Sequence, residues 1–264
     1  MRSIYSILGA RGFCSLLALI CCTGDALAQE NYSLWPRRPA ALEKAQILAA
    51  EGRIKEAEAE LAPLLKKDDV VGREAREALG KINIRIALNP KTSGAHVYTV
   101  QRGDTWIGLA RRANCPLDYL MYLNQLFELK GLQVGQKVLL GKLDYRVEIN
   151  APQREVSLWK GDSFIKSYPI LMQRDPGKEN TATAVFSEMG MNEGQIVKVS
   201  SPVFAAADKT ILLGKGELVI GSALNGKMPK DGFYLKREDC NELSLLVRKG
   251  NEVNIIRKFE IPKP

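Results

Sequence analysis

The chain has 264 residues, a formal net charge of +8 and hydrophobic residues at 45% of its positions. This length is enough for several small domains. The positive charge could suit a nucleic-acid-binding protein, but the basic residues are spread along the chain and no RNA- or DNA-binding motif is present. We therefore expect no nucleic-acid partner. A mild general positive charge fits an envelope protein among anionic polymers, and it equally fits simple solubility.

The first 28 residues have the pattern of a signal peptide. Arg2 and Arg11 form a basic segment, residues 13–22 are an apolar run, and Ala26-Leu27-Ala28 offers a cleavage site. The run is shorter than the roughly 20 apolar residues of a membrane-spanning helix. The residues before the two candidate lipidation cysteines are not the small ones that a lipoprotein signal needs. We therefore expect secretion across the inner membrane to the periplasm or cell wall, without a stable membrane anchor.

Two cysteines, Cys115 and Cys240, remain after removal of the signal peptide. An oxidising compartment permits a disulfide between them. Free cysteines are nevertheless often buried like small apolar residues. We expect two buried free thiols, with the disulfide as the alternative.

A Pro-rich lead segment at residues 29–39 precedes a helical segment at residues 40–89. Its apolar residues recur at helical spacing in three stripes: Ala41, Ala45 and Leu48; Ile54, Ala57, Leu61, Leu64 and Leu65; and Ala75, Leu79, Ile82 and Ile86. The turn at residues 50–58 resembles the inter-helix turn of a tetratricopeptide unit. Such repeats need about three copies for stability, and this segment has room for one and a half. We expect a TPR-like helical spacer packed on its neighbours, with partner recruitment as the alternative.

The helical segment ends at Asn89-Pro90, because proline disfavours a helical residue before it. Residues 91–94 read as a short linker. The single histidine, His96, has no cysteine or second histidine nearby to complete a metal site. We expect it to be exposed at a strand edge, and we expect no metal and no cofactor.

Residues 96–141 predict two strands that flank two short helices. Residues 97–100 have strand composition, and Asp104 or Thr105 can cap the helix that follows. Pro116 suits the first position of the second helix. Residues 137–140 return as the second strand. The inward-facing residues of the helices are expected to be Leu109, Ala110, Leu117, Leu120 and Met121.

The order Gly103-Asp104-Thr105, the Asn124-x-Leu126 ending and the closing Val134-Gly-Gln-Lys-Val-Leu-Leu resemble the LysM module. This βααβ domain binds glycans that contain N-acetylglucosamine. The resemblance implies a shallow groove between two loops, in which backbone groups pair with acetamido groups and apolar side chains cover the sugar faces. The implied glycan-binding residues are Gly103, Asp104, Thr105, Trp106, Ile107, Leu126, Gly131, Leu132 and Val134. Trp106 can either stack on a sugar or fill the core.

Residues 145–258 change to the alternation of half-buried strands. Strands are predicted at residues 146–150, 155–159 and 164–170, with a hairpin turn at Lys160-Gly161-Asp162. Further strands are predicted at 196–199, 217–220 and 252–256, and one helix at 238–247. The fold class is therefore α+β with several domains, the last of them mostly β.

The opening strands and the segments 231–239 and 249–255 resemble the YkuD-type L,D-transpeptidases. Those enzymes cross-link peptidoglycan stem peptides through a cysteine thiolate that a histidine activates. Here the motif glycine is kept as Gly232, Phe233 stands in the cysteine's place, and Lys236 lies near the arginine's place. The histidine region, residues 219–223, contains no histidine. Phenylalanine has no nucleophilic atom, so the family mechanism cannot operate at this position.

Substitute nucleophiles have little support. Cys240 has no histidine partner, and a thiol without a base or a lowered pKa is a poor acyl acceptor. Ser222 with a lysine base is conceivable but has no supporting spacing. We expect a pseudoenzyme: a secreted, non-catalytic protein that binds peptidoglycan glycan strands. Its last domain would contact stem peptides or cell-wall enzymes. The alternatives are a cell-wall enzyme with non-standard residues, or a scaffold that recruits wall-synthesis proteins.

Overall fold

The computed structural model describes residues 39–257 except 68, 178–180, 193–194, 199–206, 216–217, 223–227 and 229. The described residues from Ala40 onward belong to one compact unit. The predicted signal peptide (1–28) and lead segment (29–39) lie outside the described residues, apart from residue 39. Among the helices of the described residues, none is both long and apolar enough to cross a membrane. The fold is α+β, with an N-terminal helical region and a β-rich region.

The helical region contains α1 (Ala40–Ala50), α2 (Ile54–Leu61), the 3-10 turn η1 (Ala62–Leu64) and α3 (Val70–Leu88). Gly52 has a φ of 78°, which allows the tight turn between α1 and α2. Asp69 caps α3, and its side chain accepts a hydrogen bond of 2.8 Å from the Gly72 N–H. The predicted helices are therefore present, with a third helix longer than the other two.

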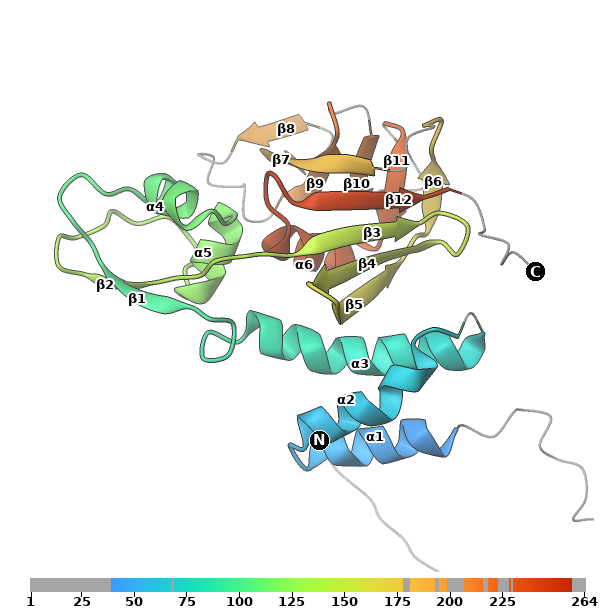
Figure 1. Cartoon of the computed structure of the whole chain (residues 1–264). Coiled ribbons are helices and arrows are strands. Elements are labelled where there is room, and N and C mark those ends of the chain that lie inside the picture. The colour runs from blue at the N-terminus through green and yellow to red at the C-terminus, as the bar shows by residue number, and fades with distance from the viewer. Residues whose placement is uncertain are drawn as a thin grey trace, which may run out of the picture. The chain divides into compact units, whose positions relative to one another are not determined.

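Helix α3 packs between the α1–α2 pair and strand β5 (Ser163–Pro169) (Figure 1). Gly80 allows the close approach to β5, because a Cβ there would lie 3.0 Å from Lys166 Cγ. The amide Nδ2 of Asn83 donates a hydrogen bond of 2.7 Å to the Phe164 carbonyl. The Phe164 ring completes the core of the helical region, a cluster made of Leu42, Ala45, Leu48, Ala57, Leu61, Ala75, Leu79 and Phe164. The helical segment thus packs on its neighbour, as expected for a spacer.

The next four elements are β1 (His96–Thr99), α4 (Trp106–Ala113), α5 (Leu117–Leu123) and β2 (Lys137–Leu140). Strands β1 and β2 pair antiparallel. Of the two predicted caps of α4, Thr105 is the one used: its hydroxyl accepts from the Gly108 N–H at 3.1 Å. Pro116 is the N-cap of α5, one residue before its predicted place. His96 is exposed, and all five predicted core residues are buried.

The β-rich region forms one ten-stranded mixed sheet in the order β5-β4-β3-β12-β7-β9-β10-β11-β6, with β8 paired to β7. Its other strands are β3 (Arg146–Asn150), β4 (Glu155–Lys160), β6 (Met172–Arg174), β7 (Thr181–Asn192), β8 (Gln195–Lys198), β9 (Asp208–Leu213), β10 (Leu218–Ser222), β11 (Gly232–Leu235) and β12 (Glu252–Ile256). Helix α6 (Arg237–Leu246) packs against β9, β10 and β11. The predicted strands and helix fall within two residues of observed elements, whereas β6, β7, β9 and β11 were not predicted.

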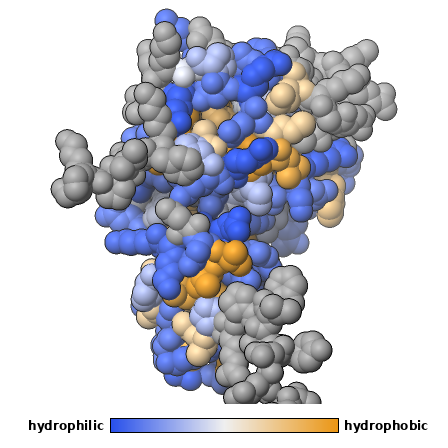
Figure 2. All heavy atoms as spheres, turned by 90° about the vertical axis from the view of Figure 1, so that its right-hand side faces the viewer, coloured by the Kyte–Doolittle hydropathy of each residue, from blue (hydrophilic) through white to orange (hydrophobic). Residues whose placement is uncertain are grey.

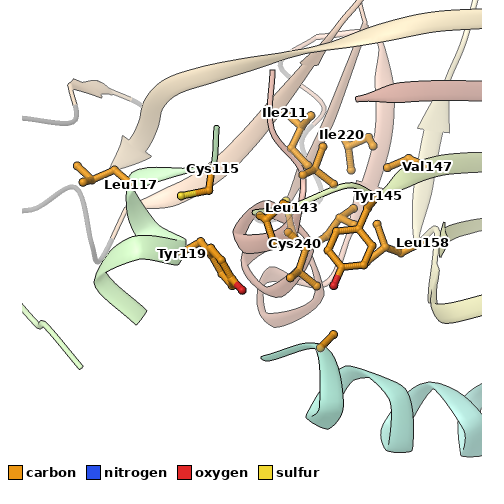
Figure 3. Packing of buried hydrophobic residues seen from close by; sticks show 14 of the residues in the cluster. Cys115, Leu117, Tyr119, Leu143, Tyr145, Val147, Leu158, Ile211, Ile220 and Cys240 are labelled. Carbon is orange, nitrogen blue, oxygen red and sulfur yellow. The ribbon is translucent and has the colours of Figure 1, made fainter. Parts of the chain in front are cut away.

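A single hydrophobic cluster joins the βααβ segment to the β-rich region. Tyr119 of α5, Leu143 and Tyr145 of the connection, and residues of the sheet all belong to it (Figure 3). Cys115 and Cys240 lie in this cluster as free, buried thiols, so the disulfide alternative is not what the structure shows. The face drawn in Figure 2 is mainly hydrophilic, with hydrophobic residues in small groups.

Candidate functional site

Two loops of the βααβ segment are held side by side: the β1–α4 loop and the α5–β2 loop. Val100 N–H donates to the Gln136 carbonyl at 2.8 Å, and the Gly135 N–H donates to the Val100 carbonyl at 2.9 Å. Farther along, the indole Nε1 of Trp106 donates to the Lys130 carbonyl at 2.7 Å. These bonds fix the separation of the loops at two points, so the surface between them is preformed.

The first loop is further stiffened by a network around Asp104. Its carboxylate accepts from the Gln101 N–H at 2.8 Å, from the Tyr98 hydroxyl at 2.9 Å and from Arg112 at 3.0 Å. The side chain is only 5% exposed. The backbone N–H of Gln101 is the main cause that lowers the pKa of Asp104, followed by Tyr98 and Arg112, while desolvation opposes them. Asp104 therefore orders the loop rather than offering a free carboxylate.

The predicted glycan-binding residues divide into a surface set and a supporting set. Gly103, Thr105, Gly131 and Val134 are exposed, and Ile107, Leu126 and Leu132 are half-buried. A Cβ built on Gly103 or Gly131 would meet no atom within 4 Å, so the backbone of both loops is open to a ligand. The supporting set is Asp104 and Trp106.

Trp106 fills the core, which decides between the two alternatives for this ring. Its side chain is 6% exposed and belongs to the cluster around Leu109 and Ala110. A buried ring with its N–H satisfied has no free face for a sugar. Its contribution to the surface is indirect, through the bond to the Lys130 carbonyl.

Asn124 supports the second loop, a role that the sequence did not indicate. Its Nδ2 donates to the carbonyls of Leu120 and Leu139 at 2.8 Å each, and its Oδ1 accepts from the Leu139 N–H at 2.7 Å. The amide thereby mimics a strand partner at the end of α5. The Asn124-x-Leu126 pattern was the available signal, but pattern alone does not show the bonding.

In the β-rich region, the structure brings the two expected motif segments together. Strands β10 and β11 pair in parallel, with Val219 opposite Gly232 and Ile220 opposite Phe233. Phe233 is fully buried in the core. Gly232 has a φ of 154°, and a Cβ there would lie 2.1 Å from the Val219 carbonyl oxygen. This glycine is therefore required by strand packing. Lys236 is exposed at the N-cap of α6.

The two alternative nucleophiles are also buried. Cys240 is 0% exposed and its Sγ donates to the Lys209 carbonyl at 3.3 Å. Burial raises the pKa of this thiol to about 12, so it is not a thiolate at neutral pH. Ser222 is 6% exposed at the end of β10. Within the described residues, no group of three or more His, Cys, Asp or Glu side chains could hold a metal ion.

Comparison with known proteins identifies one module and one distant likeness. The LysM domain model matches residues 98–141. Two solved structures are similar over about half of the chain. L,D-transpeptidase 1 of Mycobacterium tuberculosis has 7% sequence identity and a TM-score of 0.33, and the alignment covers 46% of this chain and 68% of that protein. An L,D-transpeptidase from Mycobacterium smegmatis has 10% sequence identity and a TM-score of 0.31, and the alignment covers 47% of this chain and 65% of that protein.

TM-scores this low support no conclusion about activity. No curated protein matches the sequence. The βααβ order, the paired strands, the two bridged loops and the family match lead to one assignment: residues 98–141 are a LysM domain, a module that binds peptidoglycan glycan.

Proposed function

We propose that this chain is a secreted protein that binds peptidoglycan glycan strands through its LysM groove and catalyses no reaction on them. The observation that carries the proposal is the pair of bridged loops, which present open glycine backbone and apolar side chains side by side. Such a surface matches an N-acetylated sugar, which offers amide groups to the backbone and apolar ring faces to the side chains. The signal-peptide pattern of residues 1–28 supports a location in the envelope.

The absence of catalysis is inferred from the chemistry of the residues at the expected motif. Phe233 has no nucleophilic atom and is buried, and the Cys240 thiol is buried with a raised pKa. A cysteine mechanism needs an accessible thiolate with a base beside it. Binding without chemistry is consistent with the rule that function belongs to the site rather than to the fold.

Gly131→Trp gives a sharp test of the groove. Gly131 lies outside the left-handed φ range and has open space around its Cβ position, so a side chain can be added there beside the exposed backbone of the second loop. We expect the affinity for purified sacculi in a sedimentation assay to fall by about tenfold or more. Lys249→Trp, on an exposed turn of the β-rich region, is the matched control and should bind normally. Unchanged binding by Gly131→Trp would remove the groove as the site.

A second experiment addresses catalysis. Purified protein is incubated with muropeptides, and the products are analysed by mass spectrometry. We expect no change in the cross-links. New or lost cross-links that persist in a Gly131→Trp variant would show an enzymatic activity in the β-rich region.

A further inference from the structure

A second concave surface lies between the LysM domain and the β-rich region. It is a cleft of about 720 Å³, bounded by α5, the residues after it, β9 and α6, with Leu88 at the end of α3 also in its lining. Its size is in the range of small-molecule and oligosaccharide sites. Leu126, a half-buried residue of the predicted glycan groove, also lines this cleft. The cleft and the predicted groove therefore share this residue.

The charged residues that line the cleft are paired with opposite charges. Asp118 of α5 and Lys209 of β9 form an ion pair at 3.1 Å, and both side chains are 8% exposed. Glu242 of α6 accepts from Lys166 at 2.5 Å and from the Tyr168 hydroxyl at 3.1 Å. The Asp118–Lys209 pair is buried, and a buried charge persists when it is paired in this way. Each charged side chain that the described part of the chain contributes to the cleft thus has a partner of opposite charge, which disfavours the charged stem peptides as ligands.

The rim of the cleft carries two aromatic rings and amide groups. Phe127 is 94% exposed and Tyr122 is 45% exposed. Single exposed apolar residues are ordinary on protein surfaces, but these two line the same cleft, together with the amides of Gln125 and Asn241. Aromatic faces match the apolar faces of sugar rings, and amides both donate to and accept from hydroxyl and acetamido groups. This combination suits a neutral sugar.

We propose that the cleft is an extension of the LysM groove that holds further N-acetylated sugar units of the same glycan strand, with Phe127 and Tyr122 as the stacking platforms. The inference rests on the proposed function of the groove. It makes the chain selective for long glycan strands, since only a strand longer than the groove reaches the cleft.

The test is titration calorimetry with neutral N-acetylglucosamine oligomers of increasing length. We expect the affinity of the unaltered protein to rise by about tenfold between short oligomers that fill only the groove and longer ones. The double variant Phe127→Ala/Tyr122→Ala should lose that increase while it binds short oligomers normally. The exposure of both rings makes a folding defect unexpected. Ile47→Ala, which removes an exposed apolar side chain on α1, is the control and should keep the increase.

The outcomes separate the two proposals. Binding of short oligomers without any gain from length would overturn the cleft and leave the groove intact. A gain that survives in the double variant would also overturn the cleft. If no oligomer of any length binds, the proposed function of the groove fails. If a muropeptide with its stem binds more tightly than the same glycan without it, and the double variant removes that difference, the cleft takes peptide and the inference is wrong.

Discussion

Trp106 provides the most informative perturbation, because its two interpretations predict opposite results. In the structure the ring is a core element whose N–H tethers the second loop. Trp106→Ala should therefore lower the free energy of unfolding by about 3–5 kcal/mol, as is typical for the loss of a buried aromatic ring. Trp106→Phe keeps most of the apolar volume and removes the donor to Lys130. It should cost about 1 kcal/mol.

The assay combines urea unfolding with sugar binding. Unfolding is followed by far-ultraviolet circular dichroism, because the chain has three tryptophans and fluorescence would change with the substitution itself. Binding of an N-acetylglucosamine oligomer is measured by calorimetry at a temperature where each variant is folded. We expect Trp106→Phe to unfold at lower urea and to bind more weakly but still measurably, because it removes the bridge to the Lys130 carbonyl and leaves the bridge at Val100 in place.

Trp159→Phe is the matched control. Trp159 also donates through Nε1, to the Ser157 hydroxyl at 2.9 Å, but it lies in β4 next to the helical region. Its substitution should lower stability and leave binding unchanged. The reasoning about Trp106 would be refuted if Trp106→Phe lost sugar binding while its urea midpoint stayed at the unaltered value. That result would place the indole against the sugar.

Two further predictions concern stability. Gly232→Ala should lower the free energy of unfolding by about 3 kcal/mol or more, because its Cβ would meet the Val219 carbonyl oxygen. Gly214 has a φ of 58° and open space around its Cβ position, so Gly214→Ala should cost only about 1–2 kcal/mol in the same urea experiment. Equal losses in the two variants would contradict the packing argument. The lowered pKa of Asp104 means that its stabilisation is complete above the ordinary value of 3.8 and is lost as the pH falls through the lower folded value. Asp104→Asn should therefore make the acid unfolding of the LysM domain less steep, and an unchanged pH profile would speak against the network.

The LysM domain could be predicted well because its signals are local. Its helix caps and short strands lie within a few residues of each other, so the cap of α4 could be narrowed to Asp104 or Thr105 from the chain, and the structure selects Thr105. The helical region was predictable for the same reason, from periodicity. The prediction of the helices rests on spacing within single elements, whereas the prediction of the LysM domain also rests on a resemblance to a known family.

The sheet was harder to predict, because tertiary contacts override local pattern there. All four residues of β11 are buried, so it has no alternation to detect. Strand β9 begins with Asp208 and Lys209, which sequence rules place at the surface, yet both are buried. Lys209 is buried because Asp118, far away in the chain, pairs with it. No local pattern contains that information.

The candidate binding surfaces were predictable only where their residues lie close together in the chain. The family resemblance pointed to the loops on either side of the groove, and the structure confirms that these loops lie together. The sequence does not predict a cleft at Tyr122 and Phe127, because α6 and β9, which lie far from them in the chain, form its other side. A cleft between two regions has no signature in either one.

The buried connection after β2 affects how this protein can be divided. Gly141, Leu143 and Tyr145 are all buried, and a Cβ on Gly141 would lie 2.8 Å from Tyr119 Cε1. Cutting the chain after residue 141 would remove Leu143, Tyr145 and the β-rich region from the hydrophobic cluster that also contains Tyr119 and Cys115. An excised LysM fragment would thus expose apolar side chains and make the Cys115 thiol more accessible, and it would tend to self-associate. A fragment that keeps the groove in its native surroundings therefore includes the β-rich region as well as the LysM domain.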